Sequence, residues 1–79
     1  MATLEEVKTA LGITGDYQND TITIYMNEVI DFLKDAGVKP ENIKSGLVAK
    51  GVADLWDYVG GEGKFSEAFK ILATQKSYL

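Results

Sequence analysis

The sequence predicts an all-α fold, a small bundle of about four helices that forms one domain over residues 1–79. Its apolar residues recur at the helical period in separate segments, and capping residues and glycines stand at the ends of these segments. The segment 21–25, four of whose five residues are β-branched, has no second strand-like run to pair with, which argues against a sheet. A chain of 79 residues is near the size at which a single core is only just sufficient, so we expect support from oligomerisation.

The longest periodic segment, Asp20–Gly37, is expected to be the central helix. Asp20 is placed to cap its first turn, and Gly37 is placed to end it in the left-handed conformation. Its core-facing residues are expected to be Ile22, Met26, Val29 and Leu33. Ile24 falls instead on the opposite, acidic side, which makes it a candidate contact between subunits.

A shorter helix is predicted ahead of the central one. Thr3 and Glu6 have the capping-box spacing, in which each side chain bonds the other residue's free backbone amide, and Gly12 is the natural stop. A helix of about two to three turns is not stable alone, so we expect it to pack on the central helix. Residues 13–19 show no periodicity and are interpreted as a loop, in which Asp16 lacks the ligand spacing of a calcium site.

A third helix is predicted from Lys44 or Ser45 to Tyr58 or Val59, after a proline-containing turn. Its apolar residues cover nearly half of its circumference, and those expected in the core are Leu47, Leu55 and Trp56. Gly51 in its interior predicts the close approach of a neighbour. Such a broad surface indicates either a helix on which all the others pack or one that also meets another subunit.

The segment after the third helix is predicted to be a partner-docking loop made of Gly60, Gly61, Glu62, Gly63 and Lys64. It is not a phosphate-binding loop, because a helix precedes it and Phe65 follows its lysine. Its glycines carry a large ordering cost, so we expect it to be mobile in a free subunit and ordered in an assembly. Ser66 then caps a last helix, whose core residue is Phe69.

The charge is distributed unevenly along the chain. Seven acidic residues and three lysines precede Pro40, and five of each follow it, so the net charge of −4 belongs to the first half. This asymmetry favours contact between the two halves of neighbouring subunits. The candidate intersubunit residues are Ile24, Asp31, Asp35, Lys50 and Lys70. The absence of arginine and of a concentrated basic face argues against sequence-specific nucleic-acid binding.

The residue types exclude most chemistry. The chain has no histidine and no cysteine, which removes the usual general base, the thiol nucleophile, disulfides and a structural zinc site. Paired carboxylates lie on predicted polar faces, where solvation explains them. We therefore expect no enzyme activity, no cofactor and no metal. No apolar run approaches the ~20 residues that span a bilayer, and no leader segment is apparent, so we expect a soluble protein that stays where it is made.

Three stretches together resemble the head-tail connector (adaptor) family of tailed bacteriophages: LEEVKTALGIT at 4–14, the loop and helix at 16–37, and GVADLWDYVGGEGKFS at 51–66. The resemblance implies an all-helical structural protein without catalysis. It also implies a self-assembled ring, dodecameric in the virion, that lies beneath the portal protein, extends the DNA channel and docks a downstream neck or tail protein. The implied location is the head-tail junction of the virion, with assembly in the host cytoplasm.

The competing hypothesis is a small monomeric protein-binding or regulatory module that uses the third helix as a groove for a peptide. The two hypotheses differ in their oligomeric state, because a ring requires self-association and a module does not. Light scattering across a range of concentrations discriminates between them.

Overall fold

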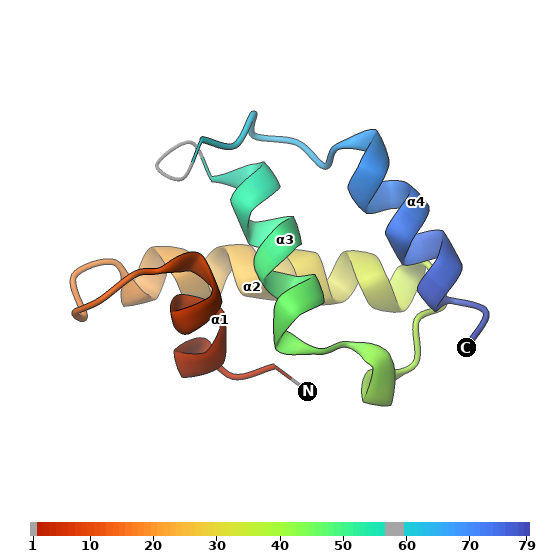
Figure 1. Ribbon diagram of the computed structural model, residues 1–79, viewed down its shortest axis with the longest axis horizontal. Coiled ribbons are helices and arrows are strands. Elements are labelled where there is room, and N and C mark those ends of the chain that lie inside the picture. The colour runs from red at the N-terminus through yellow and green to blue at the C-terminus, as the bar shows by residue number, and fades with distance from the viewer. Residues whose placement is uncertain (1, 57–59) are drawn as a thin grey trace.

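The computed structural model describes residues 2–56 and 60–79, and over these residues it is all-helical (Figure 1). The long helix α2 lies behind α3, and α1 and α4 flank α3 on its two sides (Figure 1). The elements are α1 (Leu4–Leu11), α2 (Asn19–Asp35), the short 3₁₀ turn η1 (Pro40–Asn42), α3 (Ser45–Leu55) and α4 (Glu67–Lys76). The predicted all-α fold of about four helices is thus confirmed for the described part of the chain.

Helix α1 begins and ends as the sequence predicts. Thr3 and Glu6 form the reciprocal capping box, with the Glu6 amide 3.2 Å from Thr3 Oγ1 and the Thr3 amide 3.1 Å from Glu6 Oε1. Gly12 takes the left-handed conformation, with φ 74°, and closes the helix. The packing differs from the expectation in one respect: α1 contacts α3 as well as α2, so the central helix is only part of its support.

Helix α2 begins earlier than predicted. It starts at Asn19 after Gln18, which makes no side-chain cap, so the prediction that Asp20 caps this helix is wrong. The reason lies in the preceding loop, where the Asn19 amide donates to the Asp16 carbonyl at 3.3 Å and opens the first turn before Asp20 is reached. Asp20 lies inside that turn, where its charge suits the positive end of the helix dipole. Gly37 has φ 92°, the left-handed conformation that was predicted.

Helix α3 ends earlier than predicted. The chain is extended at Trp56, with φ −107° and ψ 110°, so the helix stops at Leu55 and the predicted end at Tyr58 or Val59 is too late. These last two residues lie outside the described part of the chain. The apolar period of the sequence continues past Leu55, but the amides of Glu62 and Gly63 occupy the carbonyl of Asp54, near the end of α3, in place of a helical partner.

One core joins the helices. The residues expected in it that are buried are Ile22, Met26, Val29, Leu33, Leu47, Trp56 and Phe69. Leu55 was expected with them but is only partly buried, because it is the last residue of α3 and lies at the edge of the core. Gly51 sits at the centre, where a Cβ atom would lie 2.7 Å from Val29 Cγ1 and 2.9 Å from Phe69 Cζ. Side chains of α2 and α4 therefore fill the space that a side chain at position 51 would need.

Candidate functional site

The functional candidates in the described part of the chain are surfaces. Within residues 2–56 and 60–79, no group of three or more His, Cys, Asp or Glu side chains is placed to hold a metal ion. No helix in those ranges is long and apolar enough to cross a membrane. The features that remain to be explained are two charged surfaces, a loop and a buried lysine.

The first surface is the outer face of α2. Ile24 is 60% exposed there, and four exposed carboxylates share its side of the helix, since residues spaced at the helical period recur on one face. We name this face the acidic stripe: Asp20, Ile24, Glu28, Asp31 and Asp35. It lies opposite the buried side of α2. Neither of the two ion pairs found among the described residues involves the stripe, so its carboxylates are left to solvent.

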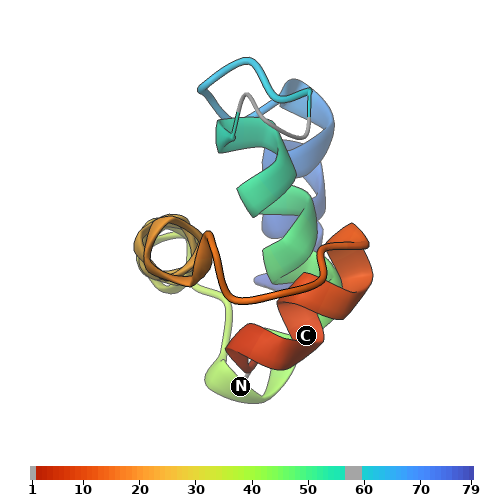
Figure 2. The same cartoon turned by 90° about the vertical axis from the view of Figure 1, so that its left-hand side faces the viewer.

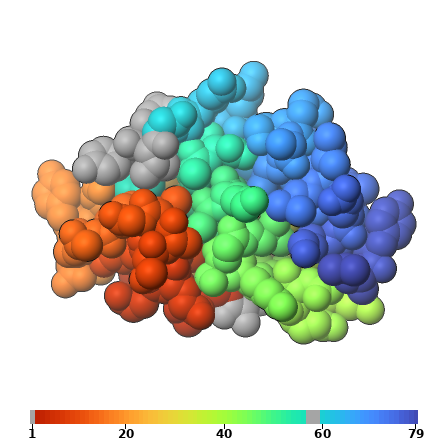
Figure 3. Space-filling model, viewed as in Figure 1, coloured from red at the N-terminus to blue at the C-terminus, as the bar shows by residue number. Residues whose placement is uncertain are grey.

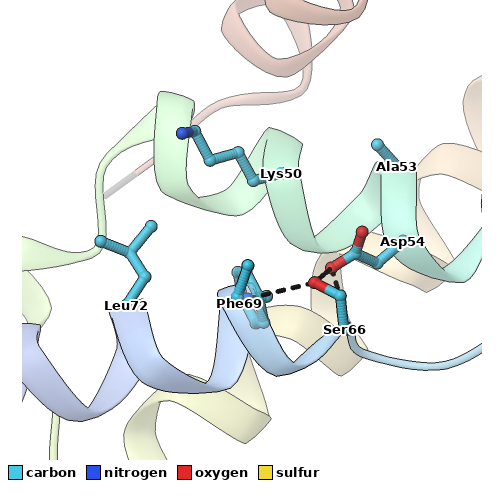
Figure 4. Close-up of a pocket in the computed structure, with 7 residues that line it drawn as sticks. Lys50, Ala53, Asp54, Ser66, Phe69 and Leu72 are labelled. Carbon is cyan, nitrogen blue, oxygen red and sulfur yellow. Dashed lines mark hydrogen bonds between the residues drawn. The ribbon is translucent and has the colours of Figure 1, made fainter.

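The second surface is a groove between α3 and α4. It consists of two hollows of about 280 and 500 Å³ that share Lys50 and Leu72. Leu72 and Phe69 project from α4 toward α3, and Lys50 extends from α3 at the other side of the opening (Figure 4). The α3–α4 seam reaches the surface on the face shown in Figure 3. We name the surface the lysine groove after lining residues Lys44, Leu47, Lys50, Leu72 and Lys76.

The structure divides the predicted intersubunit residues between surfaces. Three of them share the acidic stripe: Ile24, Asp31 and Asp35. Lys50 lies in the lysine groove, whereas Lys70 does not line it and has its Nζ atom 3.6 Å from Glu67 Oε1. Lys44 and Lys76 are groove residues that sequence reasoning missed. Periodicity assigns residues to faces of one helix, and it carries no signal for which faces of α3 and α4 end up side by side.

The glycine-rich loop is tied to the end of α3. The amides of Glu62 and Gly63 both donate to the Asp54 carbonyl at 3.1 Å. A Cβ atom at Gly61 would lie 2.0 Å from a backbone carbonyl oxygen of α3, so only glycine fits. The Asp54 carboxylate accepts a hydrogen bond from the Ser66 amide at 3.2 Å, and Ser66 in turn caps α4 as predicted. The loop has more fixed contacts than its composition suggests, and its further ordering in an assembly stays a prediction.

These surfaces can be compared with known proteins. A family model described as phage gp6-like head-tail connector protein matches residues 1–73 of the chain. The chain belongs to this family. The match spans α1, α2, α3 and most of α4, so it covers the whole acidic stripe and most of the lysine groove. It confirms the resemblance seen in the sequence. Comparison with curated proteins and with solved structures finds no match.

Membership of the head-tail connector family gives the chain a structural role at the junction of the phage head and tail. A connector works by binding the components on either side of it and further copies of itself. The residues that matter for such a role are those on exposed surfaces. For this connector, the acidic stripe, the lysine groove and the loop at residues 60–64 are therefore the candidate interaction sites.

The buried Lys8 is a feature of this connector that sequence reasoning missed. It is 4% exposed, and its Nζ atom donates to Asn19 Oδ1 at 2.8 Å and to the Gly15 carbonyl. A third, longer contact of 3.4 Å joins it to Asp16 Oδ1. These bonds tie the loop at residues 13–19 to α1, and Asp16 contributes the longest of the three contacts.

The sequence does hold one signal for this burial. Lys8 lies about one turn from both Leu4 and Leu11, which places it on the apolar side of the connector's first helix. A lysine on a buried face must find acceptors, because an unpaired buried charge is very costly. Its acceptors come from a loop, and only the tertiary structure decides which loop residues reach it.

Proposed function

We propose that copies of this connector associate side by side into a closed ring beneath the portal protein, dodecameric in the virion, and that the genome passes through the ring. Family membership over residues 1–73 is the observation that carries this proposal. The virion neck is then the final location of the protein, and the host cytoplasm is where it assembles. A structural part of this kind needs no catalysis and no cofactor, so we propose no enzymatic activity.

The subunit surfaces support a ring. A closed ring requires a heterologous interface, with two different and complementary patches on each subunit. The acidic stripe and the lysine groove are such patches, and in Figure 2 α2 lies to one side of the α3 and α4 pair. Individual surface ion pairs contribute only about 0–1 kcal/mol, so charge sets the orientation of the subunits while apolar contact drives their association.

The same energetics favour assembly on a template. An interface of exposed ion pairs around a small apolar contact gives weak association in dilute solution. The portal holds subunits next to one another and raises their effective concentration, so the ring completes there. The loop at residues 60–64 is the proposed docking element for the portal or for the downstream neck or tail protein.

The charge of the chain suits a channel. With a net charge of −4 and no arginine, the ring surrounds DNA without gripping it, because like charge keeps a polyanion from adhering to the wall. Sequence-specific recognition of the genome is not part of this proposal.

Imaging tests the proposed function. Connector and portal are mixed, and electron microscopy is expected to show a connector ring stacked coaxially on the portal. Light scattering of the connector alone, across concentrations, measures how far the subunits associate without the portal. A chain that stays monomeric at high concentration and ignores the portal contradicts the proposal. The monomeric protein-binding or regulatory module then replaces it, with the lysine groove as the site for an acidic peptide.

A further inference from the structure

We infer that the acidic stripe of one subunit seats in the lysine groove of the next, with Ile24 over Leu72. The inference rests on the proposed function, which supplies the self-association of subunits into a ring. It adds which two surfaces of the subunit meet. The contact runs head to tail, so each subunit uses its stripe toward one neighbour and its groove toward the other.

The acidic stripe carries charge that its own subunit does not compensate. Asp31 and Asp35 lie about one turn apart, as do Glu28 and Asp31, so neighbouring carboxylates repel each other. Among the described residues, neither ion pair reaches them. A partner that carries both cations and an apolar contact reduces the repulsion among these carboxylates and buries the exposed isoleucine between them.

The lysine groove has that chemistry. Lys44, Lys50 and Lys76 line it, and in the described part of the chain none of the three takes part in an ion pair. Leu72 lines the groove with them; it is partly buried and projects from α4 toward α3 (Figure 4). The groove therefore combines three cations with an apolar contact at Leu72, the complement of the carboxylates and Ile24 in the stripe.

The stripe is long enough to span the groove. From Asp20 to Asp35 it extends about 22 Å along α2, at about 1.5 Å per residue. The groove is walled by α3 and α4, of 11 and 10 residues, which are about 15–16 Å long by the same rise. A helix laid along the seam thus reaches both ends of the groove, in the helix-in-groove mode of recognition.

A second copy suits the groove better than nucleic acid does. The chain has no arginine, the residue that recognises phosphate best. A phosphate backbone has no counterpart to Ile24 for the apolar Leu72. The stripe does not reach the groove of its own subunit, because it lies on the outer face of α2, opposite the side that packs on the core.

Disulfide trapping tests the contact directly, since the chain has no cysteine of its own. The variant Ile24→Cys with Leu72→Cys is oxidised in the ring on the portal, and a ladder of covalent oligomers is expected on a non-reducing gel. The matched control is Ile24→Cys with Ile71→Cys, because Ile71 is 57% exposed and adjacent in sequence but does not line the groove. Equal ladders from the two variants overturn the inference.

Charge reversal is a second measurement that leaves Leu72 in place. Asp31→Lys with Asp35→Lys is expected to lower the ring yield on the portal by about tenfold or more, and so is Lys50→Glu with Lys76→Glu. All four changes in one chain are expected to restore the yield to within about twofold, because a reversed stripe then meets a reversed groove.

The control for charge reversal is Lys39→Glu with Glu41→Lys, at exposed positions outside both surfaces. The inference is overturned if the wild type forms rings and either reversed pair forms them in undiminished yield. It is also overturned if the fourfold variant shows no rescue. The proposed function still stands in both cases. Wild-type subunits that form no ring overturn the proposed function itself. If Lys50→Glu with Lys76→Glu abolishes binding to a duplex DNA fragment and leaves the ring yield unchanged, the groove serves a polyanion and the inference is again overturned.

Discussion

Gly51 of α3 faces Phe69 of α4 so closely that a Cβ atom at position 51 would lie 2.9 Å from Phe69 Cζ. The same ring lies 5.9 Å, centroid to centroid, from Phe32 of α2, so one side chain fastens α4 to both neighbouring helices. Helix α4 forms one wall of the lysine groove. Because Gly51 leaves room for the Phe69 ring, it also determines how closely α4 approaches α3 across the groove.

Gly51→Ala is expected to lower the free energy of unfolding by up to about 2 kcal/mol. Overpacking against Val29 and Phe69 costs about 1–3 kcal/mol, and better helix propensity returns about 1 kcal/mol. Gly46→Ala in the same helix is the matched control, because nothing lies within 4 Å of a Cβ atom there, and it is expected to be neutral or stabilising. Urea unfolding of both variants checks this, and stabilisation by Gly51→Ala contradicts the packing described for the core.

Trp56→Ala is not expected to fold as an isolated subunit. Trp56 is 6% exposed and its ring lies 6.3 Å from that of Tyr25. Truncating a buried tryptophan costs about 3–5 kcal/mol, as much as the core of so small a domain supplies. Far-UV circular dichroism and thermal melting measure the effect, with the 95% exposed Tyr17 as the site of a silent Tyr17→Ala control. Unchanged helix content and melting temperature in Trp56→Ala contradict a structural role for this residue.

Lys8→Met is expected to lower the free energy of unfolding by about 1–3 kcal/mol, because it leaves the acceptors at Asn19 and Gly15 without their donor. Asp16→Ala is the comparison: its side chain is 88% exposed and its contact with Lys8 is 3.4 Å, so its loss is expected to cost less than about 1 kcal/mol. Amide exchange of residues 15–19 is expected to quicken in Lys8→Met. Equal effects of the two substitutions show that the ion pair, and not the hydrogen bonds to Asn19 and Gly15, holds the loop.

The loop at residues 60–64 is expected to exchange its amides readily in the free subunit and slowly in the ring on the portal. Its bonds from Glu62 and Gly63 end on the single carbonyl of Asp54, and a short loop held by so few bonds opens locally at low cost. Three glycines add a large ordering cost that a partner compensates. Strong protection of these amides in the free subunit contradicts the docking role, since the loop is then already fixed.

The sequence predicts the helices of this connector well, because their signals are local. The capping box at Thr3, the cap at Ser66 and the left-handed Gly37 depend on residues within one turn of each other. The end of α3 was predicted too late because two loop amides bond the Asp54 carbonyl, a non-local contact that periodicity does not register. The acceptors of Lys8 come from a loop beyond α1, and their placement is equally non-local.

The candidate site divides in the same way. The acidic stripe belongs to one helix, so the helical period brings Ile24, Asp31 and Asp35 together from the sequence alone. The lysine groove lies between two helices that a loop joins. Its lining residues from α3 and α4 become neighbours only when Phe69 packs against Gly51. That is why Lys50 was named as a candidate contact without Lys44 and Lys76, and why Lys70, which pairs with Glu67, was named as a candidate too.

Two exposed isoleucines provide the last prediction, which separates apolar drive from charge in ring assembly. Ile24 and Ile71 are 60% and 57% exposed, but only Ile24 lies in the acidic stripe. Burying an isoleucine stabilises an interface by about 1.5–3 kcal/mol, so Ile24→Ser is expected to weaken each subunit contact by about tenfold to a hundredfold, and Ile71→Ser is expected to leave it unchanged.

The weakening of each subunit contact by Ile24→Ser multiplies around a ring, because a closed ring requires all of its contacts to form together. Ring yield on the portal at matched subunit concentrations measures it, and circular dichroism confirms that both variants fold. Added salt distinguishes the two contributions: screening weakens orientation by charge, whereas the deficit of Ile24→Ser relative to Ile71→Ser persists. Equal ring yields from the two variants contradict a buried Ile24, and the apolar drive for assembly must then come from another surface.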